Sequence, residues 1–146
     1  MSPIHRWIQQ PTTGTPPLGV QGYASCHIGK DIFYFAGHCG HERCYHNSLF
    51  CLSTETLAWN ELFPTSQTSG PMRKADTALL SFDDQLLTVA GRGSGAPTNP
   101  SPLAKYSEYR GWLYTNEHHI FNRESGEHHL SLAQYVFTGP INCLQN

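Results

Sequence analysis

The sequence predicts an all-β chain of short strands joined by tight turns. Its clearest apolar runs are IFYFA at 32–36, SLFCL at 48–52 and LLTVA at 86–90. These runs are rich in aromatic and β-branched residues, and a Gly, Asn or Asp bounds each on at least one side, which is typical of strands that end at turns. No apolar run has the length of a helix, and the chain contains 13 Gly and 10 Pro. These features favour β structure throughout.

The composition and charge of the chain argue against some classes of binding partner. The 146 residues have the length of one ordinary domain, and 38% of them are hydrophobic. The net charge is −2 with Lys and Arg scattered singly, so we expect neither a nucleic-acid partner nor a membrane surface. The first residues contain no apolar stretch of the kind found in secretory signals, and no run is long enough to cross a bilayer. We therefore expect a cytoplasmic protein whose five cysteines are free thiols.

The first strand pair of a repeated unit occurs twice. Residues 17–37 and 71–91 align without a gap at an offset of 54, from a proline to a closing Ala-Gly. Apolar positions coincide, and polar pairs at 29–30 and 83–84 coincide at the midpoint, where a hairpin turn is expected. Each copy is predicted to form a strand, a tight turn, a second strand and then a glycine.

The second strand pair repeats as well. Asn47 precedes Trp59 by 12 residues, as Asn116 precedes His128. The next proline again follows 12 residues after Trp59 and after His128. The spacing differs in one segment, because the second copy carries 15 additional residues between its closing glycine and its Asn. The chain therefore contains two four-strand units, the second with an insertion.

This spacing of motif residues resembles the kelch repeat, which forms one four-stranded blade of a β-propeller. The sequence departs from that family's pattern at Ala36 and Ala90, where the family has the first of two glycines, and at His128, where it has tryptophan. The residues that carry the resemblance are Pro17, Gly37, Asn47, Trp59, Pro71, Gly91, Asn116 and Pro140.

The resemblance implies a partial β-propeller built of four-stranded antiparallel kelch blades. Trp7 is interpreted as the last-strand tryptophan of a preceding blade. The expected divisions are a last-strand remnant at 1–13, repeat 1 at 14–65, repeat 2 at 66–134 with a long inserted loop at 92–115, and the start of a truncated third repeat at 135–146.

Two repeats are fewer than a closed propeller contains, since such rings have roughly four to eight blades. Two explanations stay open at this point. The chain is either a piece of a longer propeller or a unit that self-associates, with several copies completing a ring.

The loop after the first glycine concentrates possible metal ligands. It offers His38, Cys39, His41, Cys44 and His46 within nine positions. A metal site, a redox pair of the two cysteines and a polar loop facing a partner are all compatible with it. The polar loop is the favoured interpretation, and no metal or cofactor is expected, because residues 92–115 of the second copy contain neither His nor Cys.

The insertion begins rich in Gly, Pro and Ser and ends in an aromatic and cationic cluster. Exposed Tyr, Trp and Arg are common anchors of protein interfaces, so the cluster is a candidate partner-binding loop. The equally weighted alternative is that these aromatic side chains fold back over the blade edge. The candidates are Tyr106, Tyr109, Arg110, Trp112 and Tyr114.

No catalytic motif is found in the sequence. The paired histidines at 118–119 and 128–129 fall on expected strands, where neighbouring side chains point to opposite faces. The favoured function is therefore a protein–protein interaction module that presents rim loops to a protein partner, as kelch propellers do. The alternatives are a fragment of a metal-dependent propeller enzyme similar to galactose oxidase, or a remnant without stable function.

Overall fold

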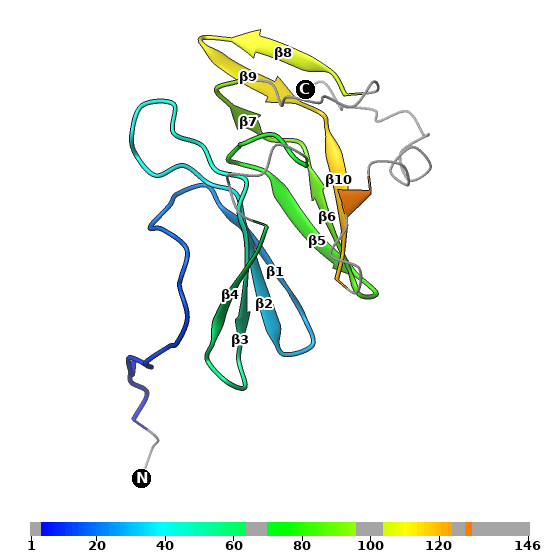
Figure 1. Ribbon diagram of the computed structural model, residues 1–146. Helices are drawn as coiled ribbons and strands as arrows, with labels where there is room; N and C mark the ends of the chain where they lie inside the picture. The colour runs from blue at the N-terminus through cyan, green and yellow to red at the C-terminus, as the bar shows by residue number, and fades with distance from the viewer. Residues whose placement is uncertain (1–3, 64–69, 96–103, 124–127, 130–146) are drawn as a thin grey trace.

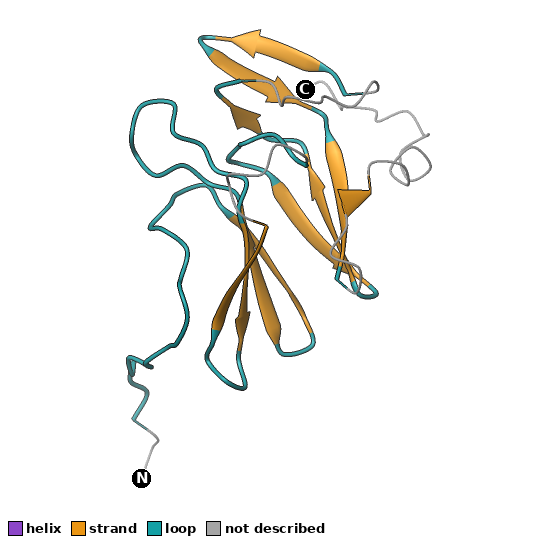
Figure 2. Ribbon diagram, viewed as in Figure 1, coloured by secondary structure: helices purple, strands orange, loops and turns teal. Residues whose placement is uncertain are grey.

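The computed structural model describes residues 4–63, 70–95, 104–123 and 128–129. Every regular element in these ranges is a β-strand, and the strands form two four-stranded sheets and one three-stranded sheet (Figures 1 and 2). Within the described ranges there is no helix that could cross a membrane. The all-β prediction and the partial propeller are thereby confirmed.

Blade 1 is an antiparallel sheet with its strands in chain order. It contains β1 (Ala24–Ile28), β2 (Asp31–Phe35), β3 (Leu49–Ser53) and β4 (Trp59–Phe63). The β1–β2 hairpin closes where the polar pair was expected, because Ile28 pairs with Asp31 and Gly29 has a φ of 57°. Glycine accepts that left-handed conformation without the steric cost that a side chain would bring.

Blade 2 repeats this sheet with one interruption. It contains β5 (Ala78–Phe82), β6 (Gln85–Val89), β10 (His118–Asn122) and β11 (His128–His129). The first two strands begin 54 positions after β1 and β2, and the last two begin 69 positions after β3 and β4. The spatial repeat therefore has the offsets of the sequence repeat.

The hydrogen bonds around each closing glycine are also equivalent in the two blades. The amide of His46 donates to the carbonyl of Gly37 over 3.0 Å, and that of Thr115 donates to Gly91 over 3.1 Å. Both glycines have strongly positive φ angles, 112° and 118°. The glycine ends the second strand and turns the chain into the rim in both copies.

The insertion differs from the expected loop. Its two ends form a third sheet in the order β7-β9-β8, made of β7 (Arg92–Gly93), β8 (Tyr106–Tyr109) and β9 (Trp112–Thr115). Residues 110–111 close the β8–β9 hairpin, and Gly111 there has a φ of 80°. These strands were not predicted from the sequence, because each is only two to four residues long and no strict apolar alternation marks them.

The core lies between the two blades. Blade 1 contributes the face that carries Phe33, which is fully buried. Blade 2 contributes the face of β5, β6 and β10 whose repeat positions correspond to the other face of blade 1, the one that points away from this core. Arg123 of blade 2 also forms an ion pair with Asp31 of blade 1. The principal core side chains are Phe33, Phe35, Leu49, Leu79, Leu86 and Phe121.

The chain before β1 runs across the outer edge of blade 1. Residues 4–12 form no strand, and Trp7 is fully exposed. Thr13 bridges to Ala58, and the amide of Trp59 donates to the carbonyl of Thr13 over 2.9 Å. The assignment of 1–13 to a preceding blade stays a prediction, and the expected third repeat at 135–146, with Pro140, lies outside the described residues.

Candidate partner-binding rim and His/Cys loop

Loops of both blades meet at one end of the molecule. We call this surface the rim; it consists of loop 38–46 of blade 1 and the β7–β9 sheet of blade 2. Ser94 joins the two parts, because its hydroxyl donates to the carbonyl of Arg43 over 3.0 Å. Between them lies a cleft of about 300 Å³. Its lining includes Gln21, His38, Tyr45, Asp76, Arg92 and Trp112.

Aromatic and cationic side chains form the walls of the rim cleft. Trp112 meets Tyr45 edge-on, with ring centroids 5.7 Å apart, and the guanidinium of Arg92 lies 5.1 Å from the Trp112 ring. Arg92 Nε also donates to Asp76 Oδ2 over 2.6 Å, and this bond raises the pKa of Arg92 above its ordinary value. The arginine therefore remains charged and is held in a fixed orientation beside the indole.

The five aromatic and cationic candidates of the insertion do not form one cluster. Trp112 and Tyr106 are partly buried, whereas Tyr109 and Tyr114 are 58% and 39% exposed. Arg110, at the hairpin tip, lies 5.2 Å from the Tyr109 ring. Two of the five side chains are thus partly buried and three are exposed, and a role of any of them in partner binding stays a prediction.

A buried charge cluster supports the rim from beneath. Lys74 and Glu117 are 0% and 2% exposed, and Lys74 Nζ lies 3.1 Å from Glu117 Oε1. The same oxygen accepts a bond from the amide of Met72 over 2.7 Å. The other carboxylate oxygen accepts from the Tyr106 hydroxyl over 3.4 Å and lies 3.6 Å from His119 Nε2.

The surroundings of Glu117 favour its charged form. Burial alone raises its pKa, but hydrogen bonding by His119 and the charge of Lys74 outweigh burial and lower the pKa to about 2. Burial lowers the pKa of Lys74, although Glu117 opposes that shift. Burial and the nearby carboxylate raise the pKa of Tyr106 to about 12.

This cluster was not predicted from the sequence, although the repeat contains a signal for it. At the repeat offsets, Lys74 takes the place of Val20 and Glu117 that of Ser48. A lysine and an acidic residue that enter equivalent positions of the same copy suggest a pair, because a buried charge needs a partner.

The His/Cys loop folds as a small hairpin that brings four of its five candidates together. The amide of Cys39 donates to the carbonyl of Cys44 over 3.3 Å, and that of Cys44 donates to His41 over 3.1 Å. Cys39 Sγ lies 2.8 Å from Cys44 Sγ and 3.2 Å from His41 Nδ1. His46 Nε2 lies 3.7 Å from Cys44 Sγ.

His38 has a different role from the other four. Its Nδ1 accepts a bond from the amide of Gly40 over 3.1 Å, and its ring packs against Tyr45 with centroids 4.8 Å apart. Hydrogen bonding from Cys44, then from His41 and His46, lowers the pKa of the Cys39 thiol to about 5. The partner thiol Cys44 has its pKa raised by the same hydrogen bond.

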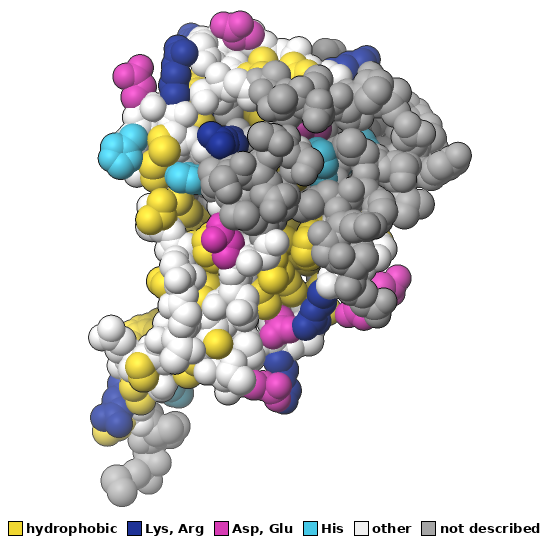
Figure 3. All heavy atoms as spheres, viewed as in Figure 1, with side chains coloured by type: hydrophobic (Ala, Val, Ile, Leu, Met, Phe, Trp, Pro, Cys, Tyr) yellow, Lys and Arg dark blue, Asp and Glu magenta, His cyan; other side chains and the backbone are white. Residues whose placement is uncertain are grey.

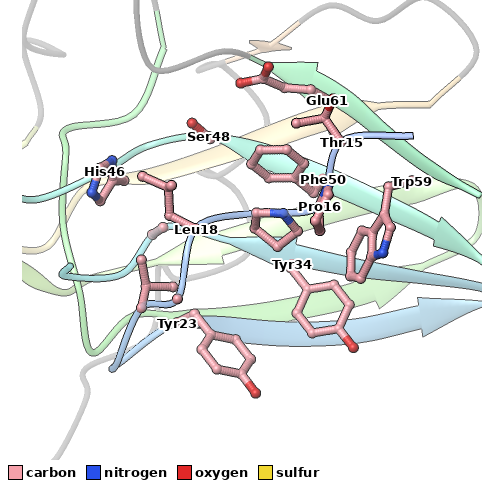
Figure 4. Close-up of a pocket in the computed structure, with 14 residues that line it drawn as sticks. Thr15, Pro16, Leu18, Tyr23, Tyr34, His46, Ser48, Phe50, Trp59 and Glu61 are labelled. Carbon is pink, nitrogen blue, oxygen red and sulfur yellow. The ribbon is translucent and has the colours of Figure 1, made fainter. Parts of the chain in front are cut away.

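A second cleft, of about 510 Å³, lies on the face of blade 1 opposite the core. Pro16 lies among Tyr34, Phe50 and Trp59 in this cleft (Figure 4). The equivalents of Tyr34 and Phe50 in blade 2 are Thr88 and His119, which are buried against blade 1. In blade 2 the equivalent face packs against blade 1, whereas on blade 1 this face carries the cleft.

Positive charge is dispersed over the described part of the surface that Figure 3 shows. On the face shown in Figure 3, hydrophobic side chains reach the surface at several points, and Lys and Arg side chains are spread out. The scattered Lys and Arg in the sequence agree with this view.

Comparison with known proteins gives a consistent result. No protein-family profile matches the chain. Kelch domain-containing protein 3 of Homo sapiens, of Bos taurus and of Mus musculus is 31% identical over 55 residues, which is 38% of this chain and 14% of each relative. The solved chain described as "Structure of YjhT" superposes with a TM-score of 0.56 at 19% identity, over 80% of this chain and 33% of that chain.

The chain thus spans a third or less of the length of these proteins. The likeness in sequence is to a protein named for kelch domains, the likeness to the solved structure concerns the fold, and the two blades described above repeat one another strand by strand. The chain is similar in sequence to a kelch protein over part of its length and has the fold of part of a β-propeller.

Proposed function

We propose that this chain is a protein-interaction module that binds a partner protein at the rim. The observation that carries the proposal is the rim cleft, whose walls come from both blades and combine Tyr45, Trp112 and a fixed Arg92. Tyrosine, tryptophan and arginine are the residue types that dominate the energetics of protein interfaces. The relatives named for kelch domains support the same class of function.

The exposed tip of the β8–β9 hairpin extends this surface. Tyr109 and Arg110 stand beside one another there, and Tyr114 is exposed further along the hairpin. A partner that fills the cleft would therefore also contact the hairpin. The charge of Arg110 favours a ligand with an acidic group, and the aromatic walls of the cleft favour an apolar group.

Selection of peptides from a random display library on the immobilised chain tests this proposal. We expect enriched peptides that share an acidic residue next to apolar ones and that bind the isolated chain in solution. Substitution of Tyr109→Ala or Arg110→Ala should weaken binding by about tenfold or more, the effect of losing an interface anchor. Both residues are exposed, so neither variant should change the melting temperature.

The matched control is Glu61→Ala on β4, which is exposed and lies away from the rim. It should leave peptide binding unchanged. Peptides that bind the Tyr109 and Arg110 variants as well as the original chain would contradict the rim as the binding surface.

The four described cysteines, Cys26, Cys39, Cys44 and Cys51, are free thiols. The proposed site of action is the cytoplasm, where a reducing environment keeps cysteines as thiols. The role is that of an adaptor or scaffold, without a catalytic step of its own.

A further inference from the structure

The His/Cys loop gathers four side chains that are typical zinc ligands. We propose that Cys39, His41, Cys44 and His46 bind one Zn²⁺ or a similar borderline divalent cation at the rim. This inference goes beyond the proposed protein-binding function, because partner binding at the cleft does not require a metal.

The first support is convergence of donor atoms. The ligand atoms of Cys39, His41 and Cys44 all lie within 4.8 Å of one another. His46 Nε2 lies 3.7 Å from Cys44 Sγ, which makes His46 the candidate for the fourth ligand. Two thiols and two imidazoles form a donor set that suits tetrahedral zinc.

The second support is the spacing of these atoms. With Zn–S bonds of about 2.3 Å and Zn–N bonds of about 2.0 Å, the sulfur–nitrogen edges of a tetrahedral site are roughly 3.5 Å long. The Cys39–His41 and Cys44–His46 separations are 3.2 and 3.7 Å, close to that value. The two sulfurs are 2.8 Å apart, so they would separate by about 1 Å to reach a sulfur–sulfur edge of roughly 3.8 Å.

The third support is the backbone that holds the ligands. The hairpin closes through Cys39 and Cys44 themselves, and Gly40 and Arg43 adopt the positive φ angles, 89° and 56°, that its tight turn requires. Nδ1 of His38 accepts from the Gly40 amide, which fixes the turn next to the first ligand. Such a frame holds the donor atoms together before an ion arrives, which lowers the ordering cost of binding.

The position of the site gives it a consequence for the rim. Tyr45 lies between the ligands Cys44 and His46 in the chain, and its ring contacts Trp112 across the cleft. An ion bound to both flanking residues would fix the Tyr45 wall of the cleft, so zinc would tune the shape of the partner-binding surface.

Titration of the fully reduced chain with Co²⁺, and competition by Zn²⁺, tests the site. We expect one equivalent of Co²⁺ to produce the intense visible bands of a tetrahedral site and the sulfur-to-cobalt charge-transfer band. One equivalent of Zn²⁺ should abolish both signals. Zn²⁺ should also raise the melting temperature, because the ion binds the folded loop.

Cys39→Ser and Cys44→Ser should each weaken metal affinity by at least about 100-fold, the upper end of the loss seen when a residue that merely supports a ligand is removed. His41→Ala should shift the Co²⁺ bands as well as the affinity. Cys26→Ser and His27→Ala are the matched controls, since both residues lie on β1 outside the loop, and they should bind as the unaltered chain does. Circular dichroism checks that every variant retains its β structure.

Three results would overturn the proposal. The first is a reduced chain that takes up no Co²⁺ or Zn²⁺ at micromolar concentrations. The second is binding that persists at full strength in both serine variants, since the ion would then occupy other residues. The third is a Cys39–Cys44 disulfide, detected as the loss of two hydrogens in intact mass, that forms equally fast with and without equimolar Zn²⁺.

Discussion

Two alanines adopt a backbone conformation that normally belongs to glycine. Ala36 and Ala90 have φ angles of 65° and 58°, and each stands where the kelch repeat has the first of its two glycines. A left-handed alanine costs roughly 1–2 kcal/mol, so both residues strain the end of the second strand. Ala36 offsets part of that cost because its methyl group is buried in the core, 7% exposed.

Replacement of Ala90 by glycine should therefore stabilise the chain. We expect Ala90→Gly to raise the free energy of unfolding by about 0.5–1 kcal/mol, the relief of strain minus the added freedom of the unfolded chain. Ala36→Gly should gain less, since it also removes a buried methyl group. Urea denaturation of the two variants measures both values, and a larger gain for Ala36→Gly would contradict this account.

The charge of Glu117 should make stability depend on acidity. Its pKa in the folded chain is about 2, below the ordinary 4.5, so its contribution is fully present above pH 4.5 and is lost as the pH falls through about 2. The shift corresponds to a contribution on the order of 3 kcal/mol. Unfolding measured between pH 2 and pH 6 should show this loss in the original chain.

The variant Glu117→Gln should lack that dependence and be less stable at pH 7. It leaves the buried Lys74 without its carboxylate, a change that costs roughly 3–5 kcal/mol. Glu108→Gln, an exposed substitution on β8, is the control and should keep the full dependence on pH. A Glu117→Gln chain with an unchanged pH profile would show that another group is responsible.

At the scale of elements, the repeated strands were predictable and the inserted sheet was not. The strands of each blade follow from the offsets, because the apolar runs and the turn residues between them recur at matching positions. The insertion has no second copy to compare with, and its strands pair with one another rather than with a blade. The close approach of Cys39 and Cys44 likewise could not be predicted, because it depends on the register of the hairpin, which composition does not encode.

A close approach of the backbone fixes β7 at its place. A Cβ atom at Gly93 would collide with the backbone oxygen of Arg73. We expect Gly93→Ala to destabilise the chain by about 1–3 kcal/mol, the usual cost of overpacking. Gly95→Ala, two residues on, meets no atom within 4 Å and should leave the melting temperature unchanged. Equal melting temperatures for the two variants would refute the close approach.

The effect of Trp112 on stability should be smaller than that of a core residue, because we assign Trp112 to the binding surface. Its ring is partly buried against Tyr45 and Arg92, so Trp112→Ala should cost about 1–2 kcal/mol. Phe33→Ala, at a fully buried core position, should cost about 3–5 kcal/mol. Thermal unfolding compares them, and equal costs would mean that Trp112 belongs to the core and not to the rim.

At the scale of the whole molecule, each blade has one face without a neighbouring blade among the described residues. On blade 1 this is the face with the larger cleft, and on blade 2 it includes Leu80 and Phe82, which are 53% and 42% exposed. Exposed apolar surface of this kind favours association. The two uncovered faces are of the same two types that already pack together between the blades. The repeat therefore indicates how the faces of two copies would fit together.

We expect the isolated chain to self-associate as its concentration rises. Leu80→Lys should shift the weight-average mass measured by light scattering toward the monomer, because it places a charge in the apolar face. Glu108→Lys, which introduces a lysine on the hairpin, should have no such effect. A chain that remains monomeric at all concentrations would contradict self-association and leave only the fragment interpretation.

The insertion also affects the order in which the molecule can be assembled during synthesis. Blade 1 is complete once Phe63 has left the ribosome, whereas the last described strand of blade 2 emerges about 65 residues later. At the usual rate of about 5–20 residues per second, that interval lasts roughly 3–13 seconds. The chain connecting β6 to β10 is about twice as long as that connecting β2 to β3, which adds only about 0.6 kcal/mol to closure. Leu79 and Leu86 of the core therefore emerge early, whereas Phe121 arrives only after the insertion, and a nascent-chain chaperone would find the unfilled part of the core exposed in that interval.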